Sequence, residues 1–287
     1  MKLSKMEGNQ MQYKTLIVDG PYFIHRAHSA PYHLSTKDGL DATIIHTATR
    51  SLNFLRKKFN PDKIILTWES HGTESWRRKQ NPNYKETKIP LAQKFIDEIK
   101  DFQTLLYLFK VKQFYAPRNE ADDVIAKLTT LEKRPIIIHT TDKDIMQLIT
   151  NDIHIWTGKE IVNEEKVREK FKVEPKYIPD LLAIAGDTAD NIQGIKGVGY
   201  KKAAKLINEF GMVEQMSIFG NLSNSIKIQE QVLKNKRLTQ LNMNCELHEV
   251  PNKDFKTDHT IESIMDKYNL KQMKEKIEEY KLLKGKH

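Results

Sequence analysis

The chain of 287 residues has little of several features that define other classes of protein. It contains one cysteine, Cys245, which excludes an intramolecular disulfide and a cysteine-rich zinc site, and a small buried hydrophobe is its simplest interpretation. It has no apolar run long enough to cross a membrane, and its polar start lacks the apolar core of a signal peptide. We therefore predict a cytoplasmic protein.

The chain is also poor in acidic residues relative to basic ones. It has 38 Asp and Glu against 47 Lys and Arg, which gives a formal net charge of +9. This balance favours a polyanionic partner, with nucleic acid as the first candidate, although many basic proteins bind none. No feature of the sequence indicates an oligomer, and we expect a monomer.

What the chain does contain is a regular alternation of strand and helix patterns. Residues 1–12 are polar and predict a disordered tail. Helical patterns separate predicted strands at 13–18, 63–68, 111–115, 134–139 and 153–156. The alternation predicts an α/β core over residues 13–185, with a mainly parallel sheet and helices on both faces. A helical region over residues 186–287 is expected to pack on that core.

Acidic residues follow the predicted strands or stand in the turns directly after them. Because the carboxyl ends of parallel strands meet at one edge of a sheet, we expect these side chains to gather there. Acids in a first helical turn can simply complement the helix dipole, but this many acids on one edge repel one another unless cations neutralise them. The acids are Asp19, Glu69, Glu120, Asp122, Asp123, Asp142, Asp144, Asp187 and Asp190.

Clustered carboxylates without histidine or cysteine partners select hard ions that prefer oxygen ligands. The pattern therefore predicts Mg²⁺ as the cofactor, with Mn²⁺ able to substitute. Two such ions roughly 4 Å apart can clamp an in-line phosphoryl displacement. The acids thus indicate a phosphoester hydrolase.

The segment after Asp190 combines closely spaced glycines with a basic helix. Gly194, Gly197 and Gly199 stand in G-I-K-G-V-G, where they allow a tight hairpin. The next helix presents unpaired N–H groups to an anion such as a phosphate. A lone G-x-x-G-x-G is a common turn, but its position after paired acids indicates a nuclease. The lysines that add charge beside it are Lys201, Lys202 and Lys205.

Residues 71–90 are polar, basic and low in aliphatic side chains, so they cannot build a core of their own. A solvated loop is the simplest interpretation. Aromatic rings interleaved with cations, however, suit single-stranded nucleic acid, because rings stack on bases and cations contact phosphates. The segment contains Trp76, Arg77, Arg78, Tyr84, Lys85 and Lys88.

Together these motifs resemble the flap endonuclease family, specifically the phage 5′–3′ exonucleases and the 5′-nuclease domain of bacterial DNA polymerase I. The matching segments follow the family order over residues 13 to about 210: I-V-D-G, an acid after the second strand, N-P-N-Y-K, E-A-D-D, T-D-K-D and G-D-T-A-D-N-I-Q-G-I-K-G-V-G. The final third of the chain matches only in general character. The resemblance implies a PIN-like, flap-endonuclease-like fold with a helical arch at about 71–90 and a helix–hairpin–helix element.

The resemblance also implies roles for the acids. One set would hold the catalytic first metal ion, with Asp123 adjacent to it: Asp19, Glu69, Glu120 and Asp122. A second set would hold the other ion: Asp142, Asp144, Asp187 and Asp190. The family usually has aspartate at the position of Glu69, so ligation through water is an alternative there.

The same resemblance assigns the basic residues. The arch would pass the 5′ single strand, with Lys85 on the scissile phosphate, Lys88 at a position where arginine is common, and Tyr84 stacked on a base. Arg26 matches a basic position near the active site, and Arg77 and Arg78 would add DNA contacts. The hairpin from Gly194 to Lys205 would grip the duplex backbone and bind K⁺ through its carbonyls.

We therefore predict a structure-specific 5′ nuclease that acts as a 5′–3′ exonuclease and flap endonuclease on DNA, in phage or bacterial replication or repair. A related ribonuclease that removes RNA primers from RNA/DNA hybrids is an alternative, since the sequence does not separate RNA from DNA preference. A junction-binding protein with a decayed metal site is another. A simpler PIN-domain ribonuclease is a third, but it would lack the hairpin after the acids.

Overall fold

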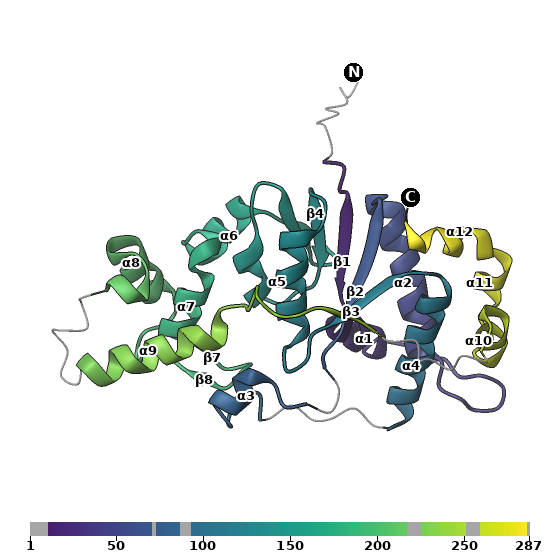
Figure 1. The fold of residues 1–287 in the computed structure, drawn as a ribbon, viewed down its shortest axis with the longest axis horizontal. Helices are drawn as coiled ribbons and strands as arrows, with labels where there is room; N and C mark the ends of the chain where they lie inside the picture. The colour runs from purple at the N-terminus through teal and green to yellow at the C-terminus, as the bar shows by residue number, and fades with distance from the viewer. Residues whose placement is uncertain (1–10, 71–72, 87–92, 217–224, 251–258, 286–287) are drawn as a thin grey trace, which may run out of the picture.

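A computed structural model describes residues 11–70, 73–86, 93–216, 225–250 and 259–285 of the protein (Figure 1). The tail predicted over residues 1–12 lies almost entirely outside this part of the chain, and so does Lys88. Among the described helices, none combines the length and the apolar character that a membrane crossing requires.

A seven-stranded sheet in the order β6-β5-β4-β1-β2-β3-β9 forms the centre of the molecule. Its parallel strands are β1 (Thr15–Asp19), β2 (Lys63–Thr67), β3 (Lys112–Tyr115), β4 (Ile136–His139) and β5 (Ile153–Trp156). Two short antiparallel strands lie at the edges, β6 (Ile161–Val162) and β9 (His248–Glu249). The predicted mainly parallel sheet is confirmed, and the C-terminal region adds β9 to it.

The strands send alternate side chains into two separate hydrophobic cores. Leu16 and Val18 of β1 are buried in one core, and Ile17 between them is buried in the other. The first core lies beneath α1 (Gly20–His28), α2 (Thr43–Phe59), α4 (Gln93–Leu108) and α10 (Ile261–Lys267). The second lies beneath α5 (Ala121–Leu131), the 3-10 helix η1 (Asp144–Leu148) and α6 (Glu164–Phe171).

The second core continues into a helical end of the molecule. Helix α7 (Ile178–Ala185) leads into a small hairpin, β7 (Gly186–Asp187) and β8 (Ile192–Gln193), and then into α8 (Tyr200–Phe210) and α9 (Ser225–Thr239). Figure 1 shows α7, α8 and α9 together at one end and α10 to α12 at the other. Two further 3-10 turns are η2 (Pro175–Tyr177) and η3 (Val213–Gln215).

Three short helices end the described part of the chain. They are α11 (Lys271–Glu275), α12 (Ile277–Lys281) and η6 (Leu282–Lys284). Lys276, with φ of −119°, lies between the two α-helices. The bend lets Met273, Tyr280 and Leu283 all lie buried in the first core.

The topology creates a switch point between β1 and β4. Strand β1 pairs with β2 on one side and with β4 on the other, so the chain leaves β1 in one direction and later returns beside it. Open α/β sheets bind ligands outside the carboxyl ends of the strands at such a point. Asp19 ends β1, and Thr140 directly follows β4.

Three side chains from the described part of the predicted arch are buried against this edge. Helix α3 (Trp76–Gln80) and the turn after it pass beside β7 and β8 (Figure 1). Arg77, Tyr84 and Lys85 are only 1%, 2% and 8% exposed. The segment is therefore solvated only in part: these three side chains are buried, whereas others such as Arg78 and Lys79 are exposed.

Candidate metal centre

The switch point holds Asp19 in a fixed position. Its carboxylate caps α1 by accepting the Tyr22 N–H at 3.1 Å, and it accepts the Thr140 hydroxyl at 2.7 Å. Thr140 also accepts the backbone N–H of Asp142. Burial, reinforced by the nearby charges of Asp142 and Glu69, raises the pKa of Asp19 to about 6. The strand end thus presents a carboxylate that is desolvated and surrounded by like charge.

Helix α5 begins with two acids that face different partners. Burial, followed by the negative charge of Asp142, raises the pKa of Asp122 well above its ordinary value, and Asp19 and Glu120 add to the effect. Asp123 instead accepts the N–H of Glu120 and two hydrogen bonds of 2.7 Å from Arg77. The charge of Asp123 is thus already paired with a cation of the protein.

Three further acids form the tightest group. Asp144, Asp187 and Asp190 each offer a carboxylate oxygen within 4.8 Å of the others. Asp144 Oδ1 is buried and has no hydrogen-bond partner. Burial and then the charge of Asp142 raise the pKa of Asp144 well above its ordinary value. An unpartnered buried oxygen in an all-carboxylate group fits a divalent cation, because such ions prefer oxygen ligands.

Two side chains from the turn after α3 reach the acids. The Lys85 ammonium lies 3.0 Å from Glu120 Oε2 and 3.7 Å from Asp190 Oδ2. The Tyr84 hydroxyl lies 3.0 Å from the first of these oxygens and 2.9 Å from the second. Burial disfavours the Lys85 cation, but the surrounding acids outweigh it and raise its pKa. Lys85 therefore stays charged and bridges the two acid sets.

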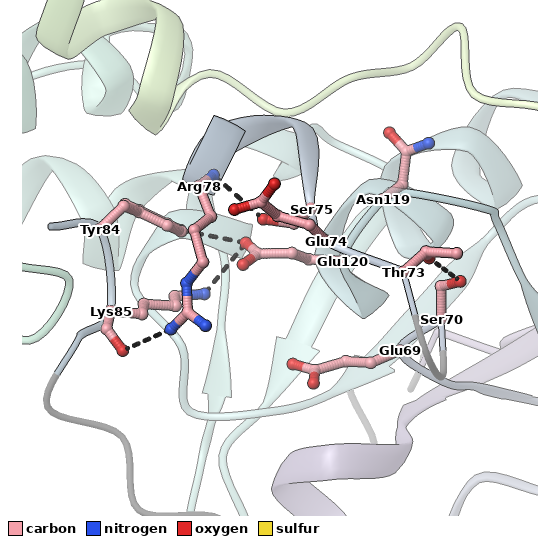
Figure 2. Close-up of a pocket in the computed structure, with 10 residues that line it drawn as sticks. All are labelled: Glu69, Ser70, Thr73, Glu74, Ser75, Arg78, Tyr84, Lys85, Asn119 and Glu120. Atoms are coloured by element: carbon pink, nitrogen blue, oxygen red, sulfur yellow. Dashed lines mark hydrogen bonds and ion pairs between the residues drawn. The ribbon is translucent and has the colours of Figure 1, made fainter. Parts of the chain in front are cut away.

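A pocket of about 370 Å³ opens between these residues and the sheet. Figure 2 shows Glu120 near its centre, with Tyr84 and Lys85 on one side and Glu69 reaching in from another. Glu69 is exposed, in keeping with its position one residue beyond the buried Trp68. The pocket is thus lined by acids from the sheet edge and by cations from the predicted arch.

Several predicted residues occupy other environments. Arg77 is buried, and its guanidinium donates to Glu120, Asp123 and two backbone carbonyls. Arg78 is exposed, and its guanidinium donates to the Lys85 carbonyl at 3.1 Å. Arg26 donates to the Tyr22 hydroxyl and packs over Gly158. Lys88 lies outside the described residues.

The predicted hairpin joins α7 to α8. A Cβ on Gly194 would lie 2.2 Å from the Ala185 carbonyl carbon, whereas Gly197 has φ of +79° and open space around it. Gly199 is the N-cap of α8. Lys201 and Lys205 point to solvent, and Lys202 Nζ donates to the Gly197 carbonyl at 3.0 Å. The glycines thus combine close packing with an exposed turn.

Two residues at the site were not singled out from the sequence. Thr140 holds Asp19, and Lys143 forms an ion pair of 2.7 Å with Asp187. Both stand in the T-T-D-K-D segment between the acids. A hydroxyl or cation inside a run of acids is a usable signal, because desolvated carboxylates need donors.

The comparisons with known proteins concern the family and the fold of the chain. Residues 14–172 match the family model of the 5′-3′ exonuclease N-terminal resolvase-like domain, and residues 173–276 match the 5′-3′ exonuclease C-terminal SAM fold. The chain belongs to the 5′-3′ exonuclease family. It is therefore a nuclease, and its carboxylate cluster is the candidate active site.

Relatives of this exonuclease cover most of its length. A 5′-3′ exonuclease from Buchnera aphidicola is 32% identical over 77% of this chain and 77% of its own. One from Aquifex aeolicus is 33% identical over 71% of this chain and 72% of its own. DNA polymerase I of Caldicellulosiruptor bescii is 29% identical over 73% of this chain but only 26% of its own.

Solved structures share the exonuclease fold. The D15 flap endonuclease of bacteriophage T5, in a complex with DNA and metal ions, has a TM-score of 0.64 at 21% identity and covers 93% of this chain and 99% of its own. The catalytic core of Rad2 with a DNA substrate has a TM-score of 0.51 at 16% identity and covers 91% and 86%. The second likeness is weaker, and both concern the fold alone.

Proposed function

We propose that this exonuclease is a structure-specific 5′ nuclease that hydrolyses DNA near a 5′ end or at a flap junction. The observation that carries the proposal is the meeting of acids from five segments of the chain with Lys85 from the predicted arch. A carboxylate cluster alone would repel a phosphodiester. A buried cation beside it, together with divalent ions, gives the site an electrostatic reason to accept one.

The acids divide into two groups that would hold two ions. The charge of Asp142 acts on both groups, since it raises the pKa of Asp19 and Asp122 in the first and of Asp144 in the second. When bound, Mg²⁺ or Mn²⁺ would lower the pKa of water and stabilise negative charge on the reacting phosphate. The first group is Asp19, Glu69, Glu120 and Asp122, and the second is Asp142, Asp144, Asp187 and Asp190.

The chain's own side chains would position the strand. Thr140 fixes the direction of Asp19, and Lys85 would exchange Glu120 for the scissile phosphate when DNA enters. Tyr84 would release its carboxylate partners to stack on a base. The buried ring of Tyr84 already lines the pocket, which places it close to the entering strand. Arg26, Arg78 and Lys88 would contribute charge around this path.

The hairpin would hold the duplex at a distance from the cut. Lys201 and Lys205 are exposed on one helix whose N-terminus has no side-chain cap, and this combination suits phosphates. Such contacts make binding sensitive to salt and largely independent of sequence. We also propose K⁺ binding at the hairpin carbonyls, where Lys202 already supplies a cation to Gly197.

Cleavage of a 5′-labelled flap duplex tests the function. The protein should release short labelled products in Mg²⁺ or Mn²⁺ and none in a chelator. A matched duplex with a blocked 5′ end and no flap should be a poor substrate. Binding without cleavage in either metal would contradict the proposal and favour a junction-binding protein. Equal or faster cleavage of an RNA flap would assign the site to primer removal instead.

A further inference from the structure

Arg77 has no donor left for a substrate. Its Nε donates to the Leu238 carbonyl at 2.7 Å, and Nη1 donates to Asp123 at 2.7 Å and to Glu120 at 3.3 Å. Nη2 donates to Asp123 at 2.7 Å and to the Gln240 carbonyl at 3.2 Å. A guanidinium has five N–H groups, so each one has an acceptor. The guanidinium also lies 4.4 Å from the Trp76 ring.

These five bonds join three parts of the molecule. Arg77 belongs to α3, Glu120 and Asp123 begin α5, and Leu238 and Gln240 lie at the end of α9. Asp123 extends the junction, because it also accepts the backbone N–H groups of Glu120 and Asn242. The residue therefore ties the predicted arch to the acidic edge of the sheet and to the helical end.

The junction acts on one oxygen of Glu120. Oε2 accepts from Arg77, Tyr84 and Lys85, at 3.3, 3.0 and 3.0 Å. Glu120 also borders the pocket. Three donors that converge on one oxygen of a carboxylate fix the orientation of the group toward a ligand in that pocket.

We propose that Arg77 is a positioning residue, which orients Glu120 for a divalent ion and sets the place of Lys85 by anchoring α3, and that it does not contact DNA. This inference rests on the proposed function of the acids. Lysine cannot replace it, because an ammonium has three donors and lacks the planar fork.

Arg77→Lys tests the proposal through metal binding. Titration with Mn²⁺, followed by electron paramagnetic resonance, should show affinity at least about 10-fold weaker than in the parent, as is typical when a group that orients a metal ligand is lost. Lys79→Met is the matched control, because Lys79 is exposed on the same helix. Its Mn²⁺ affinity should equal that of the parent.

DNA binding gives the second readout. If Arg77 contacted a phosphate, its loss would lower the slope of log affinity against log salt by about one. In a chelator, where no cleavage occurs, we expect that slope to be unchanged in Arg77→Met combined with Asp123→Asn, which removes the guanidinium charge that Arg77→Lys would keep. Unchanged Mn²⁺ affinity, or a slope reduced by about one, would overturn the inference.

The double variant also covers the case in which Arg77→Lys does not fold. Arg77→Met combined with Asp123→Asn removes both members of the buried pair and leaves no isolated charge. It should keep a cooperative thermal transition and show the same loss of Mn²⁺ affinity. If the parent bound Mn²⁺ but did not cut DNA, the proposed function would be wrong. The Mn²⁺ affinities of the parent and the variants would still decide the role of Arg77.

Discussion

Four carboxyl groups, on the buried residues Asp19, Asp144 and Asp190 and on the partly exposed Asp122, have pKa values raised chiefly by desolvation. Each of these carboxylates is less stable as an anion in the folded protein than in water. A bound cation reverses that effect, since it stabilises the anions. At the scale of residues, the site is therefore a source of instability that metal binding relieves.

Asp144→Asn should stabilise the metal-free protein. The substitution removes a negative charge from the group with Asp187 and Asp190, and the amide can donate to them. We expect the Tm in a chelator at pH 8 to rise by about 2–4 °C, which corresponds to roughly 1 kcal/mol. In Mn²⁺ the order should reverse, because the variant binds the ion more weakly and gains less from it. Flap cleavage should fall about 100-fold or more.

Differential scanning calorimetry with and without Mn²⁺ measures both effects. Asp38→Asn is the control, because Asp38 is an exposed acid away from the cluster. A lower Tm for Asp144→Asn in the chelator would contradict the account of repulsion among the acids.

The stability of the metal-free protein should depend on pH through the titration of Asp19. Its folded pKa of about 6 lies above the unfolded value of about 3.9. Asp19 therefore contributes stability that is present below pH 4 and is lost as the pH rises through 6. Asp19→Asn does not titrate and keeps one of the two acceptor oxygens, which serve the Tyr22 N–H and the Thr140 hydroxyl.

Thermal scans of the parent and Asp19→Asn in a chelator, from pH 4 to pH 8, isolate this contribution. The Tm of the parent should fall relative to that of the variant between pH 4 and about 7. A constant difference across that range would show that Asp19 does not titrate there.

At the scale of elements, two nearby positions in the hairpin require glycine for different reasons. A side chain at Gly194 would collide with the backbone of Ala185 and Gly186, whereas Gly197 has open space but a positive φ. Gly194→Ala should therefore cost about 2–3 kcal/mol of unfolding free energy through overpacking. Gly197→Ala should cost about 1 kcal/mol, the strain of the left-handed conformation alone.

Urea denaturation of the two variants provides the comparison, and each serves as the control for the other. Equal losses of stability would mean that the backbone conformation, rather than close packing against α7, limits both positions.

The same scale explains why the arch was predicted only in part. The composition of residues 71–90 predicted a segment without its own core, and within its described part Tyr84 packs against Ile192 and Leu238 of other elements. The composition did not indicate that Arg77 would be buried, because the acceptors that make burial possible lie at Asp123, Leu238 and Gln240, far along the chain. No local pattern joins these positions.

At the scale of the whole molecule, the C-terminal helices stabilise the face of the sheet opposite the helical end. Tyr268 is 1% exposed, and its hydroxyl donates to the fully buried Asp101 of α4 at 2.7 Å. Lys267 also pairs with this carboxylate. The contact fastens the end of the chain to the helix that follows the predicted arch.

Tyr268→Phe should lower the unfolding free energy by about 1–3 kcal/mol, because it removes a donor from a buried charge. Flap cleavage at 25 °C should stay close to the parent rate, since Tyr268 lies in the core away from the acids. Tyr32→Phe, at an exposed tyrosine, is the control and should leave the unfolding free energy unchanged. An unchanged unfolding free energy in Tyr268→Phe would argue against this role of the buried pair.

The sequence by itself determined the parallel sheet, the order of its elements and the acids at one edge, because strand periodicity and residue type are local properties. Only the tertiary structure decided which acids face one another. Asp122 and Asp123 are neighbours in sequence, yet one joins the electrostatic cluster and the other pairs with Arg77. The physical reason is that burial and charge pairing depend on segments brought together by the fold, and spacing along the chain does not record them.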